Sequence, residues 1–175
     1  MATVIQGPVG ANPADAASTK PGFTLGSRIR MSDGTEWVYL AVAASTTTIR
    51  QYDMVGATAT NVVAGLTSTV AGKGVLIAIA QAAVTLDASN IQYMWFLVAN
   101  PFASTSYKVR VLASAAIDAK LATTASIGSL DDTTAGTTYR VDVITLTDSQ
   151  PSGSSGSRTF RTGVNPIQLG GTLAV

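Results

Sequence analysis

Residues 28–42, RIRMSDGTEWVYLAV, predict a β-hairpin and thereby indicate the fold class of this chain. Two strand-like runs, Arg28–Met31 and Glu36–Val42, flank the pair Asp33-Gly34. Asp and Gly tolerate the positive φ angles of tight hairpin turns, so this pair between two such runs is a strong short-range hairpin signal. The stretch therefore begins a β domain.

Four further segments have the pattern of β-strands. Residues 75–80 (VLIAIA) form a continuous apolar run, which predicts burial on both faces. Residues 91–98 (IQYMWFLV) are aromatic and β-branched, and Asn100-Pro101 ends them. Residues 107–111 (YKVRV) and 139–147 (YRVDVITLT) alternate, so each should have one core face and one wet face. Together these segments predict an all-β protein.

The composition along the chain divides it into three regions. Residues 1–26 are rich in Pro, Gly, Ala, Asn and Ser and hold no period of 2 or 3.6, which predicts an extended N-terminal arm, disordered or laid along a neighbour. Residues 27–148 are the expected β domain. Residues 149–175 contain PSGSSG at 151–156 and end in apolar residues, which predicts a flexible loop and a C-terminal extension packing on the domain or a neighbour.

The surface of this chain should be largely neutral. Charged residues make up 12% of it, against about 25% in a typical globular protein. A surface with so little charge is a solubility risk for a free monomer. Burial of that surface in an assembly is one interpretation, and a monomer coated with threonine and serine is the other.

Charge and hydropathy bear on whether the chain binds nucleic acid or membranes and on where it is made. The net charge is +1 and no segment concentrates it, so we expect neither a nucleic-acid footprint nor a membrane anchor. Residues 1–10 lack the cationic and apolar parts of a secretory signal. The longest apolar stretch, residues 75–86, is too short to span a bilayer. These features predict a soluble chain made in a cytoplasm.

Few side chains here can carry enzyme chemistry. The chain has no Cys, no His and one glutamate, Glu36, which excludes Ser-His and Cys-His nucleophiles, disulfides and thiolate zinc sites. Gly72-Lys73-Gly74 lacks the flanking residues of a phosphate-binding loop. Asp131-Asp132 is the one adjacent carboxylate pair, and its Thr-rich context favours a turn over a hydrolytic or calcium-binding role. We therefore expect no enzyme activity, no metal and no cofactor, with a carboxylate-based hydrolase as a remote alternative.

Aromatic residues on the predicted strands leave two interpretations open. Trp37, Tyr93 and Trp95 could form a sugar-stacking platform, or they could pack in a core or between subunits. Because Trp37 and Trp95 each lie inside an apolar run, core or intersubunit packing is favoured.

Several of these segments together resemble the head decoration (cement) proteins of tailed bacteriophages. The resemblance lies in QYMWFLV at 92–98, VRVLA at 109–113 and LATTASIGSLDD at 121–132, and it extends over about residues 24 to 148. Members often carry a strand ending in Tyr-Gly-Trp, followed by a Val-rich strand; here Met94 stands in place of the Gly. The resemblance implies a small antiparallel β-barrel or β-tulip-like domain, with a sandwich as the other all-β possibility, and an N-terminal arm that reaches a neighbouring subunit.

It also implies a function. We expect a structural virion protein on the capsid exterior that stabilises the shell by bridging major capsid protein subunits, as a homo-oligomeric dimer or trimer assembled in the host cytoplasm, with no nucleic-acid or membrane partner. The alternative is a carbohydrate-binding head-fibre or tail module that attaches to glycans through exposed aromatic residues. The residues expected to contact the capsid or another subunit are Phe23, Leu25, Arg28, Arg30, Trp37, Phe102, Leu169, Leu173 and Val175.

Overall fold

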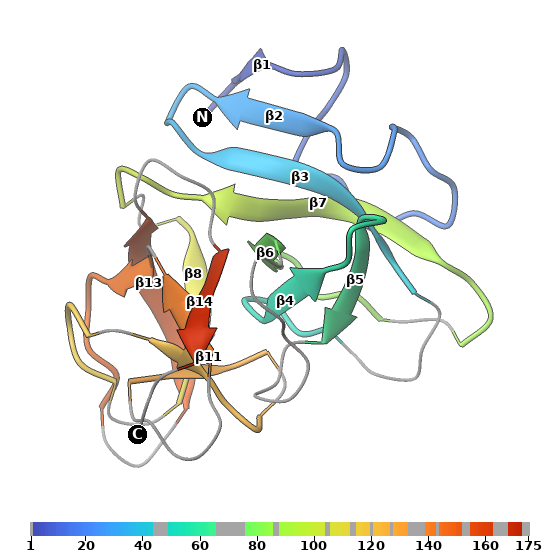
Figure 1. The fold of residues 1–175 in the computed structure, drawn as a ribbon. Coiled ribbons are helices and arrows are strands. Elements are labelled where there is room, and N and C mark those ends of the chain that lie inside the picture. Colours follow the sequence, from blue (N-terminus) through green and yellow to red (C-terminus); the bar gives the residue numbers. More distant parts are fainter. Residues whose placement is uncertain are drawn as a thin grey trace.

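The computed structural model shows an all-β chain, as the strand patterns predict. It describes residues 2–43, 49–65, 76–85, 88–103, 106–112, 115–119, 121–126, 128–132, 139–142, 144–151, 155–162 and 168–172. In these residues the chain forms fourteen strands and no helix (Figure 1). The strands are β1 (Val4–Gln6), β2 (Arg28–Met31), β3 (Glu36–Val42), β4 (Met54–Ala57), β5 (Val62–Gly65), β6 (Leu76–Ile79), β7 (Gln92–Ala99), β8 (Lys108–Val111), β9 (Ala122–Thr123), β10 (Leu130–Asp131), β11 (Tyr139–Asp142), β12 (Ile144–Leu146), β13 (Gly156–Thr162) and β14 (Gln168–Thr172).

Five of the strands close into a barrel. β3 pairs with β7 on one side and with β5 on the other, and the path continues from β5 through β4 and β6 back to β7. Successive side chains of a strand point to opposite faces, so every second residue points inward. Val38 and Leu40 of β3 and Phe96 of β7 belong to the core cluster inside the barrel. The β3–β5 pairing is parallel and the other four are antiparallel, so the barrel is mixed.

The outer face of the barrel is also buried over much of its area. Trp37 and Tyr39 of β3 and Trp95 of β7 belong to a second core cluster, which includes residues of the arm and of the C-terminal strands. Burial on both faces explains the continuous apolar run in β6, where Ile77 and Ala78 are both fully buried. The prediction for that run is confirmed.

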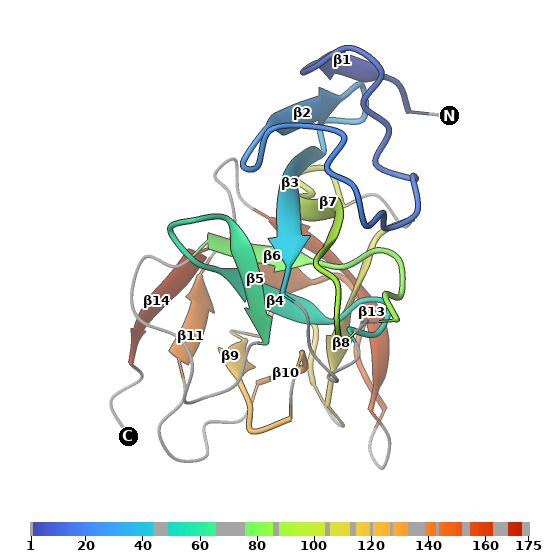
Figure 2. The same cartoon turned by 90° about the vertical axis from the view of Figure 1, so that its right-hand side faces the viewer.

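A second sheet curves beneath the barrel (Figure 2). Its strand order is β14-β11-β9-β10-β8-β13-β12, and β14 joins it to the barrel through β6. β11, the second strand of this order, ends at Asp142, and β12, its last strand, begins at Ile144, so the two ends of the curved sheet come close together where these strands meet in the chain. Val109 of β8 and Phe160 of β13 are fully buried and fill its concave side.

The expected hairpin forms between β2 and β3. Gly34 has φ +80°, whereas Asp33 stays at negative φ, so only one of the two turn residues uses the left-handed region. Asp33 instead accepts hydrogen bonds through Oδ1 from Thr35 N (3.0 Å) and Thr35 Oγ1 (2.7 Å). A glycine in this conformation after the turn is typical of a three-residue hairpin loop.

The N-terminal arm lies on the protein's own barrel. β1 pairs antiparallel with β2, and Ser18 forms a β-bridge with Tyr93. Phe23 and Leu25 pack against the outer-face core cluster. The apolar side chains spaced along this Pro- and Gly-rich segment therefore have a surface to cover within the same chain.

The C-terminal region contributes two strands to the fold. β13 pairs with both β8 and β12, and β14 pairs with β11 and β6. Both strands lie beyond residue 148, where the sequence analysis ended the β domain. Gly, Ser, Arg and Thr fill most of β13, so its single large apolar residue, Phe160, shows no period that would identify it as a strand.

Candidate functional site

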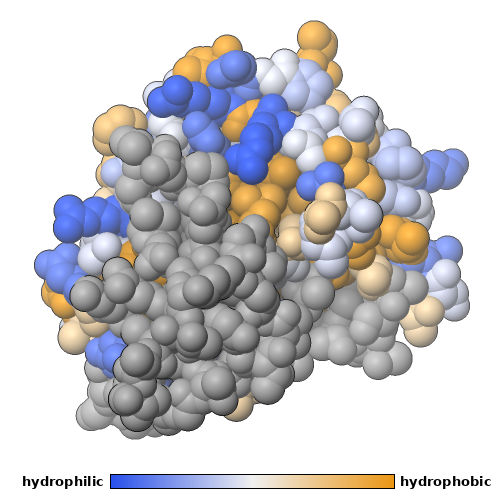
Figure 3. Space-filling view, viewed as in Figure 1, coloured by the Kyte–Doolittle hydropathy of each residue, from blue (hydrophilic) through white to orange (hydrophobic). Residues whose placement is uncertain are grey.

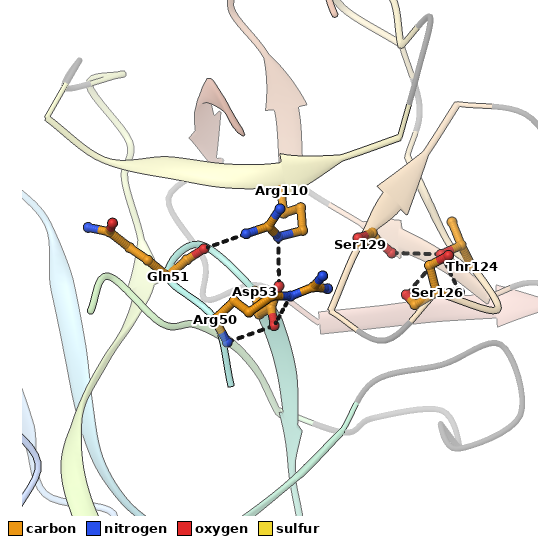
Figure 4. Close-up of polar contacts among 7 residues, drawn as sticks. All are labelled: Arg50, Gln51, Asp53, Arg110, Thr124, Ser126 and Ser129. Atoms are coloured by element: carbon orange, nitrogen blue, oxygen red, sulfur yellow. Dashed lines mark hydrogen bonds and ion pairs between the residues drawn. The ribbon is translucent and has the colours of Figure 1, made fainter. Parts of the chain in front are cut away.

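A buried carboxylate joins the barrel to the second sheet (Figure 4). The Asp53 side chain, 3% exposed, accepts hydrogen bonds through Oδ2 from Arg50 N (2.9 Å) and Nε (3.3 Å). Its Oδ1 accepts a hydrogen bond from Arg110 Nε of β8 at 2.8 Å. Arg110 Nη2 also donates to the Gln51 carbonyl oxygen at 3.3 Å. Charge-assisted hydrogen bonds of this kind are the stronger ones in proteins, and here they stabilise the contact between two sheets.

The β9–β10 hairpin docks against the same carboxylate. Gly128 has φ +75°, and a Cβ at this position would lie 2.5 Å from Asp53 Cγ. The Gly128 carbonyl accepts a hydrogen bond from Met54 N at 2.9 Å. Inside the hairpin, Thr124 Oγ1 lies 3.1 Å from the carbonyl oxygens of both Ser126 and Ser129 (Figure 4). These hydrogen bonds stabilise the turn between β9 and β10.

The adjacent carboxylates Asp131 and Asp132 also accept hydrogen bonds from backbone amides. Asp131 Oδ1 accepts a hydrogen bond from Asp132 N, and Asp132 Oδ2 accepts one from Ala116 N, both at 2.8 Å. Local backbone bonding was the interpretation favoured from the sequence. Among the described residues, no group of three or more acidic side chains is placed to hold a metal ion.

An aromatic cluster lies between the arm and the outer face of the barrel. The ring of Phe23 packs edge-on against Tyr39 (5.3 Å between centroids) and tilted against Trp95 (5.4 Å). Tyr39 Oη accepts a hydrogen bond from Gly22 N at 3.0 Å, which fastens the arm beside the cluster. Tyr93 stacks on Tyr39 at 6.4 Å. The cluster therefore stabilises the folded position of the arm.

The two tryptophans are core residues. Trp37 is 3% exposed and Trp95 is 2% exposed. Trp37 Nε1 donates to Thr35 Oγ1 at 3.2 Å, and its ring packs edge-on against Tyr107. The prediction of core packing is confirmed for both. Trp37, expected also as a contact residue, has too little exposed surface for that role, because the outer face of β3 is covered within the chain.

Tyr107 connects this region to the hairpin turn. Its hydroxyl donates to Asp33 Oδ2 at 3.3 Å. Burial of the ring, followed by the negative charge of Asp33, raises the pKa of Tyr107 above its usual value of 10.0. The tyrosine therefore stays protonated, as the hydrogen bond requires.

Three exposed apolar residues lie on or beside the part of the molecule formed by β1, β2 and the β2–β3 turn. Ile5 (63% exposed) lies on β1, Val9 (101%) follows it, and Phe102 (76%) packs on Gly34 at the β2–β3 turn. Thr3, just before β1, is bonded to the β2–β3 turn: its N donates to Ser32 Oγ, and its carbonyl accepts a hydrogen bond from Ser32 N. Figure 2 shows β1 and β2 above the barrel, where β2 pairs with the barrel strand β3 and β1 lies farther out. Figure 3 shows apolar residues between strongly polar ones on the upper part of the molecule.

We call this part of the molecule the exposed edge; its members are Ile5, Val9, Arg28, Arg30 and Phe102. Arg28 and Arg30 are both exposed, at alternate positions of β2, and so point to the same side of that strand. β1 pairs only with β2 among the described strands, so its other side is an unpaired strand edge. Unpaired edges are ready-made places for another chain to bind, and natural proteins commonly protect them with charges. No charged side chain precedes Asp15 in this sequence.

The expected contact residues are therefore only partly brought together. Arg28, Arg30 and Phe102 lie on the exposed edge, whereas Phe23 and Leu25 pack on the protein's own core. Leu169 is in β14, but its side chain, like all of Leu173 and Val175, lies outside what the structure describes. Ile5 and Val9 were not singled out from the sequence. The signal that could have found them is an apolar pair of residues, Val4-Ile5, in a segment without charge.

Comparisons with family models, with curated proteins and with solved structures found no match for this chain. The residues that the structure describes include no helix of the length and apolarity needed to cross a bilayer. The function must therefore be argued from the surface and the sequence together.

Proposed function

We propose that this chain is a structural virion protein that binds the outer surface of a tailed-phage capsid and bridges its major capsid protein subunits. The observation that carries the proposal is the exposed edge. Five large apolar side chains are exposed among the described residues, and three of them lie on this edge. Its strand β1 has an unpaired side that carries no charge of its own. Such an edge is suited to being covered by a neighbouring protein.

The rest of the described molecule supports a binding role over a catalytic one. The buried carboxylate Asp53 is neutralised by arginines that join two sheets, and the adjacent carboxylates Asp131 and Asp132 bind backbone amides. The all-β, barrel-like fold also agrees with the fold that the sequence resemblance implies. Fold alone does not establish function, so the capsid assignment comes from the resemblance and from the surface.

The proposed mechanism is burial of apolar surface across a seam between capsid subunits. A standard protein–protein interface buries about 1,600 Å² in total. At about 25 cal/mol for each Å² of apolar area, such burial opposes separation of the subunits even after the cost of association. Repetition around the shell multiplies the effect through avidity. Dimers or trimers at local symmetry axes would place one exposed edge against each neighbour.

The test is binding of the purified chain to expanded capsids of the phage that encodes it, measured by co-sedimentation over a range of concentrations. We expect saturable binding, and we expect Ile5→Lys to weaken it at least about tenfold, because burial of an isoleucine side chain contributes about 1.5–3 kcal/mol. The matched control is Ile117→Lys, which changes an isoleucine of similar exposure (53%) in the loop before β9. It should bind like the unchanged chain.

Two results would count against the proposal. Absence of saturable binding to capsids would refute the function itself. Equal binding by the Ile5 and Ile117 variants would leave capsid binding in place but remove the exposed edge from the contact.

A further inference from the structure

A cavity of about 320 Å³ lies between the arm and the outer face of the barrel. Pro13 and Ala14 of the arm form part of its wall, and Trp37 and Trp95 of the barrel line it. The loops before β4, after β6 and before β8 complete it, with Tyr52, Ala82 and Tyr107 among their lining residues. Its volume is at the small end of the range for ligand sites, which suits one compact ring.

The lining of this cavity is aromatic and polar but uncharged. Besides the four aromatic residues, the amides of Gln51 and Gln81 and the hydroxyl of Ser106 line it. None of the residues described as lining it is an Asp, Glu, Lys or Arg. A charged ligand would therefore find no counter-charge there. The Gln81 amide is bonded at both ends to the Lys108 backbone, and Gln51 Nε2 donates to the Gln81 carbonyl, so the Ser106 hydroxyl and Gln51 Oε1 are the lining side-chain groups left to bond a polar ligand.

Trp95 supplies an unused hydrogen-bond donor at this place. Its indole Nε1 is buried and has no hydrogen-bond partner among the described residues, whereas Trp37 Nε1 is bonded to Thr35. Unpaired buried donors are uncommon in folded proteins, and each needs an explanation. Trp95 also lines a second cavity of about 140 Å³, whose wall includes Ser18 and Phe23 of the arm. Two cavities therefore flank Trp95 beneath the arm, and a ligand would have to displace part of the arm to reach the indole N–H, which is covered in this structure.

Tyr52 is held rigidly at the other side of the cavity. It has φ +71°, which is uncommon for a non-glycine residue. Its N donates to the Ala80 carbonyl at 2.6 Å and its carbonyl accepts from Arg110 N at 2.8 Å, so the backbone is fixed from two strands. The fixed backbone sets the position from which the Tyr52 side chain lines the cavity.

We propose that this cavity binds a neutral pyranose unit of a glycan, with Trp95 Nε1 donating a hydrogen bond to a ligand oxygen. Aromatic rings provide apolar contact for the C–H faces of a sugar, and the Ser106 hydroxyl and Gln51 Oε1 can bond its hydroxyl groups. A proline-rich peptide is the competing ligand for an aromatic lining, but it docks in an open groove. Here the arm closes one side, so a compact ring fits better. This site is separate from the exposed edge and does not depend on capsid binding.

The test uses the full chain labelled with ¹⁵N and follows its two tryptophan indole N–H signals by NMR. The probes are methyl β-glucopyranoside, methyl β-galactopyranoside and N-acetylglucosamine, each titrated to about 50 mM, with a triproline peptide as the comparison. We expect at least one sugar to give a saturable downfield shift of the Trp95 indole proton and a smaller change at Trp37. The reason is that only the Trp95 donor gains a partner.

Paired variants identify the site. Ala82→Phe should fill the cavity and weaken the response at least about tenfold, whereas Ala83→Phe, at the adjacent exposed residue that does not line it, should respond like the unchanged chain. Ser106→Ala removes a lining hydroxyl and should weaken binding even if Ala82→Phe proves unstable. No saturable shift with any of the three sugars, equal responses from the variants and the unchanged chain, or a shift with triproline alone would each overturn the proposal.

Discussion

The close contact between Gly128 and Asp53 makes a sharp quantitative prediction for Gly128→Ala. Gly128 has φ +75°, and an added Cβ would lie 2.5 Å from Asp53 Cγ and 2.6 Å from Asp53 Cβ. Asp53 cannot easily move away, because Arg50 and Arg110 both bond its carboxylate. The substitution should therefore strain the backbone and also force the β9–β10 hairpin away from β4.

The two costs can be estimated separately. Placing alanine at positive φ costs about 1–2 kcal/mol, and overpacking a site that cannot yield costs about 1–3 kcal/mol. Their sum is about 2–5 kcal/mol, and for a domain of this size each kcal/mol lowers Tm by about 2–4 °C. Gly10 has φ +80° but nothing within 4 Å of an added Cβ, so Gly10→Ala isolates the backbone cost. That control should lose no more than about 2 kcal/mol.

Thermal unfolding followed by circular dichroism, together with urea unfolding followed by tryptophan fluorescence, measures both variants. Gly128→Ala should lose clearly more stability than Gly10→Ala. Equal losses would refute the argument that the hairpin is packed tightly against Asp53, because the backbone term alone would then account for both.

Two other substitutions test the polar contacts. Arg110→Ala removes the 2.8 Å bond to the buried Asp53 and should lower the free energy of unfolding by about 1.5–3 kcal/mol. Arg161→Ala is the control: its partner Asp118 is exposed, so this change should lower the free energy of unfolding by less than about 1 kcal/mol. Similar urea midpoints for the two variants would show that burial of the ion pair does not matter. The pKa of Tyr107 is raised in the folded protein, so its contribution to stability is complete below the unfolded value of 10.0 and is lost as the pH rises through the folded pKa. Tyr107→Phe should remove the part of the stability loss that sets in as the pH rises above the unfolded value of 10.0, and an unchanged pH dependence in urea unfolding would show that another group causes it.

Local sequence patterns identified half of the fourteen strands in the described residues, and the segment 139–147, expected as one strand, forms two, β11 and β12. Alternation at 107–111 and the apolar run at 75–80 correspond to β8 and β6 because the direction of side chains along a strand has a period of two wherever the strand lies. Gly34 specified the β2–β3 turn because glycine adopts positive φ without a steric cost, whatever the rest of the fold. The same local logic correctly favoured core packing for Trp37 and Trp95.

The candidate site could be predicted only in part. Arg28, Arg30 and Phe102 were singled out and are exposed, but Ile5 and Val9 join them only because β1 pairs with β2. The cavity beside Trp95 requires the arm, the barrel and three loops to meet, and no spacing in the sequence encodes that meeting.

What the sequence determined by itself was the all-β class, the strands with a clear apolar or alternating pattern, the hairpin turn and the scarcity of reactive side chains, because each depends on one residue or a few neighbours. Tertiary structure alone decided how the ring closes, through the parallel pairing of β3 with β5 and the joining of β14 to β6. It also decided that the arm covers its own barrel and that residues beyond 148 belong to the domain. Those outcomes depend on contacts between residues far apart in the chain, whose energies a local pattern does not contain.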